Sequence, residues 1–152
     1  MNLENLIQSI NRLKVDSQPK WGKMSAPQML KHCNKQVKLY CNESTFGLVS
    51  FFRTLCIGKL HLFYVRYVVR YDIHRYKKNS YSPGILKTTK IHEINFEEEK
   101  RRLVGQLEYV SKFNKKFRYT PLHGWVKNKT FKKNIEIHTK YHLYQFGVLH
   151  ES

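Results

Sequence analysis

The segment Ile135–His142 (IEIHTKYH), near the C-terminus, places His138 and His142 four residues apart. On a helix, residues i and i+4 lie on one face, one turn apart, so two imidazole nitrogens can bind the same metal ion. Because such a pair is common in ordinary helices, a metal site needs a third ligand. The pair continues a helical stripe that is expected to face the interior: Phe131, Ile135, His138, His142 and Gln145.

The chain has 152 residues, a formal net charge of +17 and a pI near 9.9. This length suits one core, so we expect a single domain over residues 1–152. A strong positive charge favours an anionic partner such as nucleic acid, phospholipid or an acidic substrate. The lysines are spread along the chain, however, which favours a solvated basic surface over a specific anionic partner.

Cysteine spacing and the N-terminal sequence indicate in which cellular compartment the protein is expected. Cys33, Cys41 and Cys56 form no Cys-x-x-Cys pair, so neither a disulfide framework nor a cysteine zinc site is indicated, and we expect reduced, buried thiols. The N-terminus lacks a basic start followed by an apolar run, as a secretory signal requires. We therefore expect a cytoplasmic protein.

Apolar periodicity and capping signals predict the main helices. The first spans Leu3 to Leu13, and the second begins at the capping box Ser25-Ala26-Pro27-Gln28. Another begins at Asn95 and ends near Phe113, and a turn over Thr120–Gly124 precedes the last, from about Thr130 to Phe146, with Gly147 as its stop. The predicted fold class is all-α, an antiparallel bundle of four principal helices with long crossover loops.

The stretch from Phe46 to Val69 is unusually apolar, but charged residues interrupt it, so we expect no transmembrane segment. A long buried helix, or a helix pair split near Gly58, is the main prediction; a helix lying on a membrane surface is an alternative. Its surplus of apolar residues would also suit a homodimer interface. Residues 71–90, with a turn signal at Ser82-Pro83-Gly84, are predicted to form a long basic loop.

Two motifs in combination resemble a known family. The segments Trp21 to Cys33 (WGKMSAPQMLKHC) and His138 to Gly147 (HTKYHLYQFG), with Ser82-Pro83-Gly84 between them, are similar to a bacterial group of unknown function in the DinB-like superfamily of metal-binding four-helix bundles. By this resemblance, His32, His138 and His142 would bind a divalent metal. His123 matches a further family position, although Gly124 follows it directly where the family pattern usually has proline.

The resemblance implies a metalloenzyme that acts on a small molecule, either as a hydrolase or as a transferase using a low-molecular-weight thiol. Three imidazoles with an open coordination position also suit a catalytic ion, which zinc, nickel or iron could provide. Candidates to support the ligands or line a pocket are Gln28, Gln36, Glu136, Tyr141 and His123. The basic loop would favour an anionic substrate.

The alternative to an enzyme is a non-catalytic module that binds nucleic acid or another anionic partner. Aromatic and basic side chains alternate between Tyr64 and Lys78, and such a run can stack on bases while neutralising phosphates. The residues are Tyr64, Arg66, Tyr67, Arg70, Tyr71, Arg75, Tyr76, Lys77 and Lys78. The same tyrosines could instead pack inside a helix, and no recognised nucleic-acid motif is present.

Overall fold

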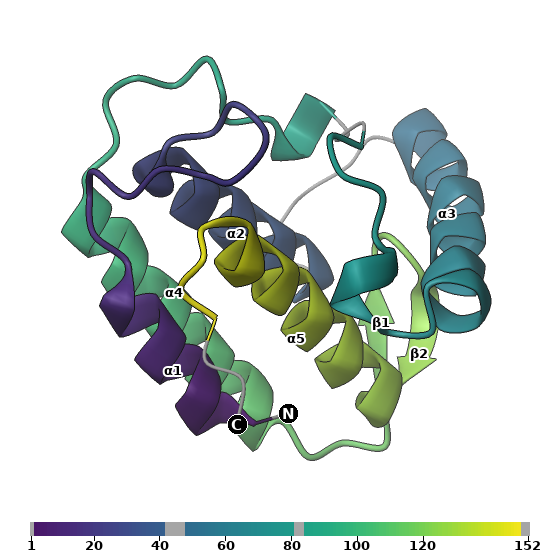
Figure 1. Cartoon of the computed structure of the whole chain (residues 1–152). Helices are drawn as coiled ribbons and strands as arrows, with labels where there is room; N and C mark the ends of the chain where they lie inside the picture. Colours follow the sequence, from purple (N-terminus) through teal and green to yellow (C-terminus); the bar gives the residue numbers. More distant parts are fainter. Residues whose placement is uncertain (1, 42–47, 81–83, 150–152) are drawn as a thin grey trace.

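A computed structural model describes residues 2–41, 48–80 and 84–149, with the backbone alone for 48–55 (Figure 1). Its α-helices are α1 (Leu3–Arg12), α2 (Ala26–Tyr40), α3 (Leu48–Phe63), α4 (Phe96–Lys112) and α5 (Asn128–Gln145). A π-helical turn (Tyr64–Val68) continues α3, and two short 3₁₀ turns (Ile73–Arg75 and Gly84–Leu86) lie in the loop that follows. Two strands, β1 (Phe117–Thr120) and β2 (Gly124–Lys127), precede α5.

The prediction of an all-α four-helix bundle is wrong. The described part of the chain contains five α-helices and a two-stranded antiparallel sheet, in which Phe117 pairs with Lys127 and Thr120 with Gly124. The residues expected to form a plain turn connect these strands. Aromatic and β-branched residues such as Tyr119 and Val126 favour extended backbone, and Gly124 adopts a φ of +69°, which suits the tight connection.

Local signals set the ends of the helices as expected. At the start of α2, Ser25 Oγ accepts a hydrogen bond from the Gln28 amide (3.4 Å), and Gln28 Oε1 accepts one from the Ser25 amide (3.0 Å), which confirms the capping box. After α5, Gly147 has a φ of +70°, and its amide donates to the Tyr144 carbonyl (3.0 Å). This geometry ends the helix at the predicted glycine.

The hydrophobic core lies between α1, α2, α4 and α5, whose inner faces meet in Figure 1. Leu6, Leu30, Leu103 and Ile135, one from each helix, are completely buried. α2 packs against both α4 and α5, and α1 packs against the same two helices. The paired faces of α2 and α5 bring distant parts of the sequence together, and the candidate site lies between them.

α3 differs from the buried or split helix that was predicted. It runs without a break through Gly58, and many of its described side chains are exposed, including Ile57, Leu60 and Phe63. Gly58 lets α3 approach the hairpin turn, because a Cβ atom there would lie 1.4 Å from the Leu122 carbonyl oxygen. The predicted turn at Ser82-Pro83 and the start of the apolar stretch at Phe46 lie outside the described residues.

No helix in the described ranges is both long enough and apolar enough to cross a membrane. Cys33 and Cys41 are buried as expected, but Cys56 is exposed, because it lies on the open side of α3.

Candidate metal centre

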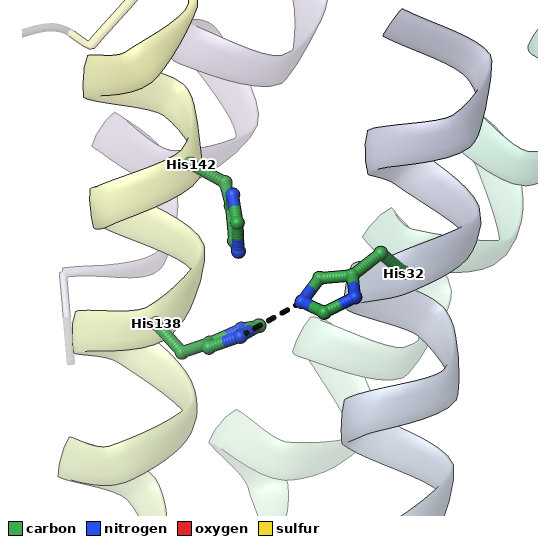
Figure 2. Close-up of side chains that lie close together, drawn as sticks. All are labelled: His32, His138 and His142. Atoms are coloured by element: carbon green, nitrogen blue, oxygen red, sulfur yellow. Dashed lines mark hydrogen bonds between the residues drawn. The ribbon is translucent and has the colours of Figure 1, made fainter. Parts of the chain in front are cut away.

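Three histidines from two helices face one another (Figure 2). His32 comes from α2, and His138 and His142 come from successive turns of α5. One ligand nitrogen from each ring lies within 4.8 Å of the others, and His32 Nε2 is 3.2 Å from His138 Nε2. Two nitrogens bound tetrahedrally to one zinc ion would lie about 3.4 Å apart. The three-histidine group could therefore hold a metal ion.

Two of the rings are held by hydrogen bonds from their outer nitrogens. His32 Nδ1 donates to the Leu86 carbonyl (2.8 Å), and His142 Nδ1 donates to Gln145 Oε1 (2.8 Å). Gln145 Nε2 in turn donates to the Trp21 carbonyl (2.6 Å), which fixes which end of the amide faces His142. With a proton on Nδ1, each ring presents its Nε2 lone pair to the centre of the group, the arrangement that metal-binding histidines typically show.

His138 is placed differently. Because His32 Nε2 has no proton in this tautomer, His138 Nε2–H is the donor of the 3.2 Å contact in the metal-free protein. A metal ion would replace that contact, and the His138 proton would then move to Nδ1. Nδ1 is buried and has no hydrogen-bond partner in the part of the chain that the structure describes. His138 thus lacks the orienting acceptor that the other two rings have.

The rings are neutral at physiological pH, the state that metal binding requires. Burial lowers the pKa of His32, and it lowers the pKa of His142 to about 3 with a further contribution from His32. Burial, followed by the neighbouring His142 and His32, holds the pKa of His138 well below its ordinary value. The group contains no carboxylate or thiol, so a tetrahedral ion would keep one position open.

Two of the predicted supporting residues bond elsewhere. Gln28 caps α2, and its Nε2 donates to the carbonyls of Thr89 (3.2 Å) and Ile91 (2.9 Å), which ties the segment before α4 to the start of α2. Glu136 forms an ion pair with Lys140 at 3.0 Å and accepts a hydrogen bond from the Asn2 amide. Both residues act in helix and loop packing.

Other predicted residues lie nearer the histidines. The Tyr141 ring is 5.3 Å from that of His142, and its hydroxyl accepts a hydrogen bond from Trp21 Nε1 (3.2 Å). Gln36 is buried one turn after His32 on α2, and its Oε1 has no hydrogen-bond partner among the described residues. The Gln36 side chain also forms a hydrogen bond with the Tyr40 side chain.

A second histidine pair had no signal in the sequence. His123, in the hairpin turn, lies with Nε2 3.3 Å from His61 Nδ1, and the two rings are stacked with centroids 5.6 Å apart. His123 also contacts the Tyr40 ring, with centroids 5.1 Å apart. The two histidines are 62 residues apart in the sequence, so only the fold brings them together.

The loop over residues 71–90 reaches the site, as expected for a long functional loop. Leu86 supplies the carbonyl that binds His32, and the Tyr76 ring packs 5.2 Å from that of Tyr141. Lys78 lies 4.6 Å above the Trp21 ring. Neither the Leu86 carbonyl nor the Gln145 side chain was predicted to support a ligand, although Gln145 stands one turn after His142 on the same stripe.

The aromatic and basic run considered for nucleic acid is divided by the fold. Tyr64 and Tyr67 are exposed, whereas Tyr71 and Tyr76 are half-buried. Fewer rings are therefore open to stack on bases than the sequence suggested, and nucleic-acid binding stays an untested prediction.

No protein-family model matches this chain, and no curated protein or solved structure matches it. The basis for assigning a function is therefore the three-histidine group and its surroundings.

Proposed function

We propose that this protein is a divalent-metal-dependent enzyme of the DinB-like type, in which His32, His138 and His142 bind the ion. The main support is the hydrogen bonding of His32 to the Leu86 carbonyl and of His142 to Gln145, because both bonds leave Nε2 free to bind metal. The resemblance described above adds the expectation of a hydrolase or a transferase that uses a low-molecular-weight thiol.

The donor set fits a catalytic ion better than a structural one. Structural zinc sites are usually closed by four protein ligands, whereas catalytic sites keep a position open. A bound divalent ion would supply Lewis-acid activation of water or of a thiolate. The histidines hold neutral nitrogens in place, and the aromatic side chains of Trp21, Tyr76 and Tyr141 form an apolar cover beside them.

Basic groups near the site favour an anionic substrate. Lys35, one turn after Lys31 on α2, is close enough to His32 to lower its pKa, and Lys35 Nζ binds the Lys87 carbonyl (3.2 Å). The Lys35 side chain therefore lies at the margin of the Leu86 turn that holds His32. A small molecule with a carboxylate or phosphate would be attracted to this side of the site.

Elemental analysis of tag-free protein, purified without chelator, tests the metal. We expect about one zinc, nickel or iron ion per chain in the wild type and a loss of the ion in His138→Ala, because two histidines alone bind weakly. His92→Ala, which removes an exposed histidine just after the long loop, should keep the ion. A wild type that binds no metal even after zinc, nickel and manganese are added would overturn the proposal.

Activity screens of the metal-loaded protein would then separate the two reaction classes. A hydrolase should cleave small anionic esters or amides without added thiol, whereas a transferase should consume a low-molecular-weight thiol together with an electrophilic substrate. Either activity should disappear in His138→Ala and persist in His92→Ala. Turnover that survives in His138→Ala would show that the reaction does not use this site.

A further inference from the structure

The outward side of α3 and of the π-helical turn that follows it carries exposed apolar side chains. Gly58, Val65 and Val69 are buried and form the inward side. The outward side presents apolar side chains with the following exposed fractions: Ile57 51%, Leu60 70%, Phe63 59%, Tyr64 37%, Tyr67 55% and Val68 55%. We name these six residues the α3 outer face. So many neighbouring exposed apolar residues mark an interaction surface.

The charges beside the α3 outer face have one sign. Lys59 and Arg66 are exposed and lie seven residues apart along one side of it, and Arg70, also exposed, follows the end of the π-helical turn with a φ of +55°. No aspartate or glutamate occurs between Glu43 and Asp72, in a chain whose net charge is +17. An exposed apolar stripe with a row of cations next to it is typical of helices that lie in the headgroup region of anionic membranes.

We propose that the α3 outer face docks on an anionic phospholipid membrane, with its apolar side chains between the lipids and Lys59, Arg66 and Arg70 at the headgroups. Aromatic residues suit this depth, since their rings are amphipathic, and Phe63 and Tyr67 pack together at 4.9 Å between centroids. The helix would lie on the membrane without crossing it. This inference is independent of the metal site.

Charge favours a membrane over a second copy of the chain. Two copies joined through the α3 outer face would bring the same three cations towards each other, and no carboxylate on this segment could pair with them. An anionic lipid surface provides the opposite charge, so each cation near the headgroups strengthens the attraction. A homodimer through this face is therefore an outcome for the experiment to detect.

Cys56 offers a reporter on the same face. It is exposed and stands four residues before Leu60 on α3, whereas Cys33 and Cys41 are buried. An environment-sensitive fluorophore attached to Cys56 of the otherwise intact protein should shift to the blue with vesicles of phosphatidylglycerol and phosphatidylcholine. Vesicles of phosphatidylcholine alone should cause little shift. Co-sedimentation of unlabelled protein with the same vesicles gives the affinity.

The decisive comparison is Leu60→Asp against Val15→Asp. Both positions are exposed, at 70% and 60%, and both variants add one negative charge, so the comparison removes the general effect of net charge. We expect Leu60→Asp to weaken vesicle binding at least about tenfold, because it places a carboxylate among the lipids, and Val15→Asp to bind like the wild type. Phe63→Asp should repeat the loss.

Four results would overturn the proposal. Equal binding by Leu60→Asp and Val15→Asp, or sedimentation without a shift of the Cys56 probe, would mean that charge alone attracts the protein. A wild-type dimer in the absence of lipid that Leu60→Asp dissociates would identify a second copy as the occupant. Binding of a short oligonucleotide in preference to the anionic vesicles, lost in Leu60→Asp, would assign the face to nucleic acid.

Discussion

Replacing Gln145 with leucine would test whether the buried amide prepares His142 to bind metal. In the native protein, Gln145 Oε1 accepts the Nδ1 proton of His142 at 2.8 Å. Without metal, His142 in the variant can move its proton to Nε2 and avoid an unpaired donor. Metal binding at Nε2 forces the proton back to Nδ1, where it would face leucine. The substitution should therefore weaken the bound state more than the free state.

The size of the effect follows from that unpaired group. Leaving a buried N–H without an acceptor costs about 1–3 kcal/mol. Since 1.4 kcal/mol corresponds to a factor of ten, zinc affinity should fall about tenfold to a hundredfold, the range found when partners of metal-binding histidines are removed. The Trp21 carbonyl also loses its 2.6 Å donor, so unfolding free energy should fall by about 1 kcal/mol.

Zinc affinity can be measured by competition with a chromophoric chelator at constant pH, and stability by urea unfolding. Gln145→Glu separates the two effects, because its carboxylate still accepts the His142 proton but cannot donate to the Trp21 carbonyl. This variant should lose stability and keep zinc affinity. Gln106→Leu makes the same chemical change in α4, at a half-buried side chain whose Oε1 has no partner, and should alter neither quantity much.

Native zinc affinity in folded Gln145→Leu would refute the reasoning, since the amide would then have no part in orienting the ligand. Equal losses of affinity in Gln145→Leu and Gln145→Glu would also contradict it, because the second variant keeps the acceptor.

Two further predictions concern stability. Gly58→Ala should destabilise the protein by about 1–3 kcal/mol, because its Cβ would meet the Leu122 carbonyl. Gly105→Ala, with open space around its Cβ, should stabilise α4 by roughly 0.5–1 kcal/mol. Urea unfolding that ranks the two variants in the opposite order would contradict the packing of α3. In metal-free protein, burial, and secondarily a neighbouring histidine, lowers the pKa of His123 and His142 to about 3, below the unfolded value, so stability should be lost as pH falls below about 6.5. Each histidine contributes about 2 kcal/mol to this loss by about pH 5, and an unfolding free energy that stays constant from neutral pH to that point would contradict the burial of neutral rings.

Short-range signals in the sequence were dependable. The capping box at Ser25, the N-cap at Asn95 and the glycine stop at Gly147 all occur in the structure, because caps and stops depend on hydrogen bonds within a few residues. The inward direction of the His138 and His142 side chains also followed from helical periodicity. His32 was matched to them only through the family resemblance.

The β-hairpin was missed because each strand has only four residues, too few for an alternating pattern to stand out. Flanking aromatic and β-branched residues were the available signal, but pairing of β1 with β2 gives them their conformation. The burial of α3 was also misjudged, since its apolar composition is the same whether its outer side meets the core or stays open.

By itself, the sequence determined where most helices begin and end, the histidine pair on one face of the last helix and the basic, acid-free character of the segment that contains α3. These properties depend on neighbouring residues and on composition. Only the tertiary structure decided that the Leu86 carbonyl and Gln145 hold the ring protons of His32 and His142, that His61 stacks on His123, and that α3 leaves an apolar face open. Each of these depends on contacts between separately formed elements, or on their absence, and the position of one element on another is set by packing of the whole core.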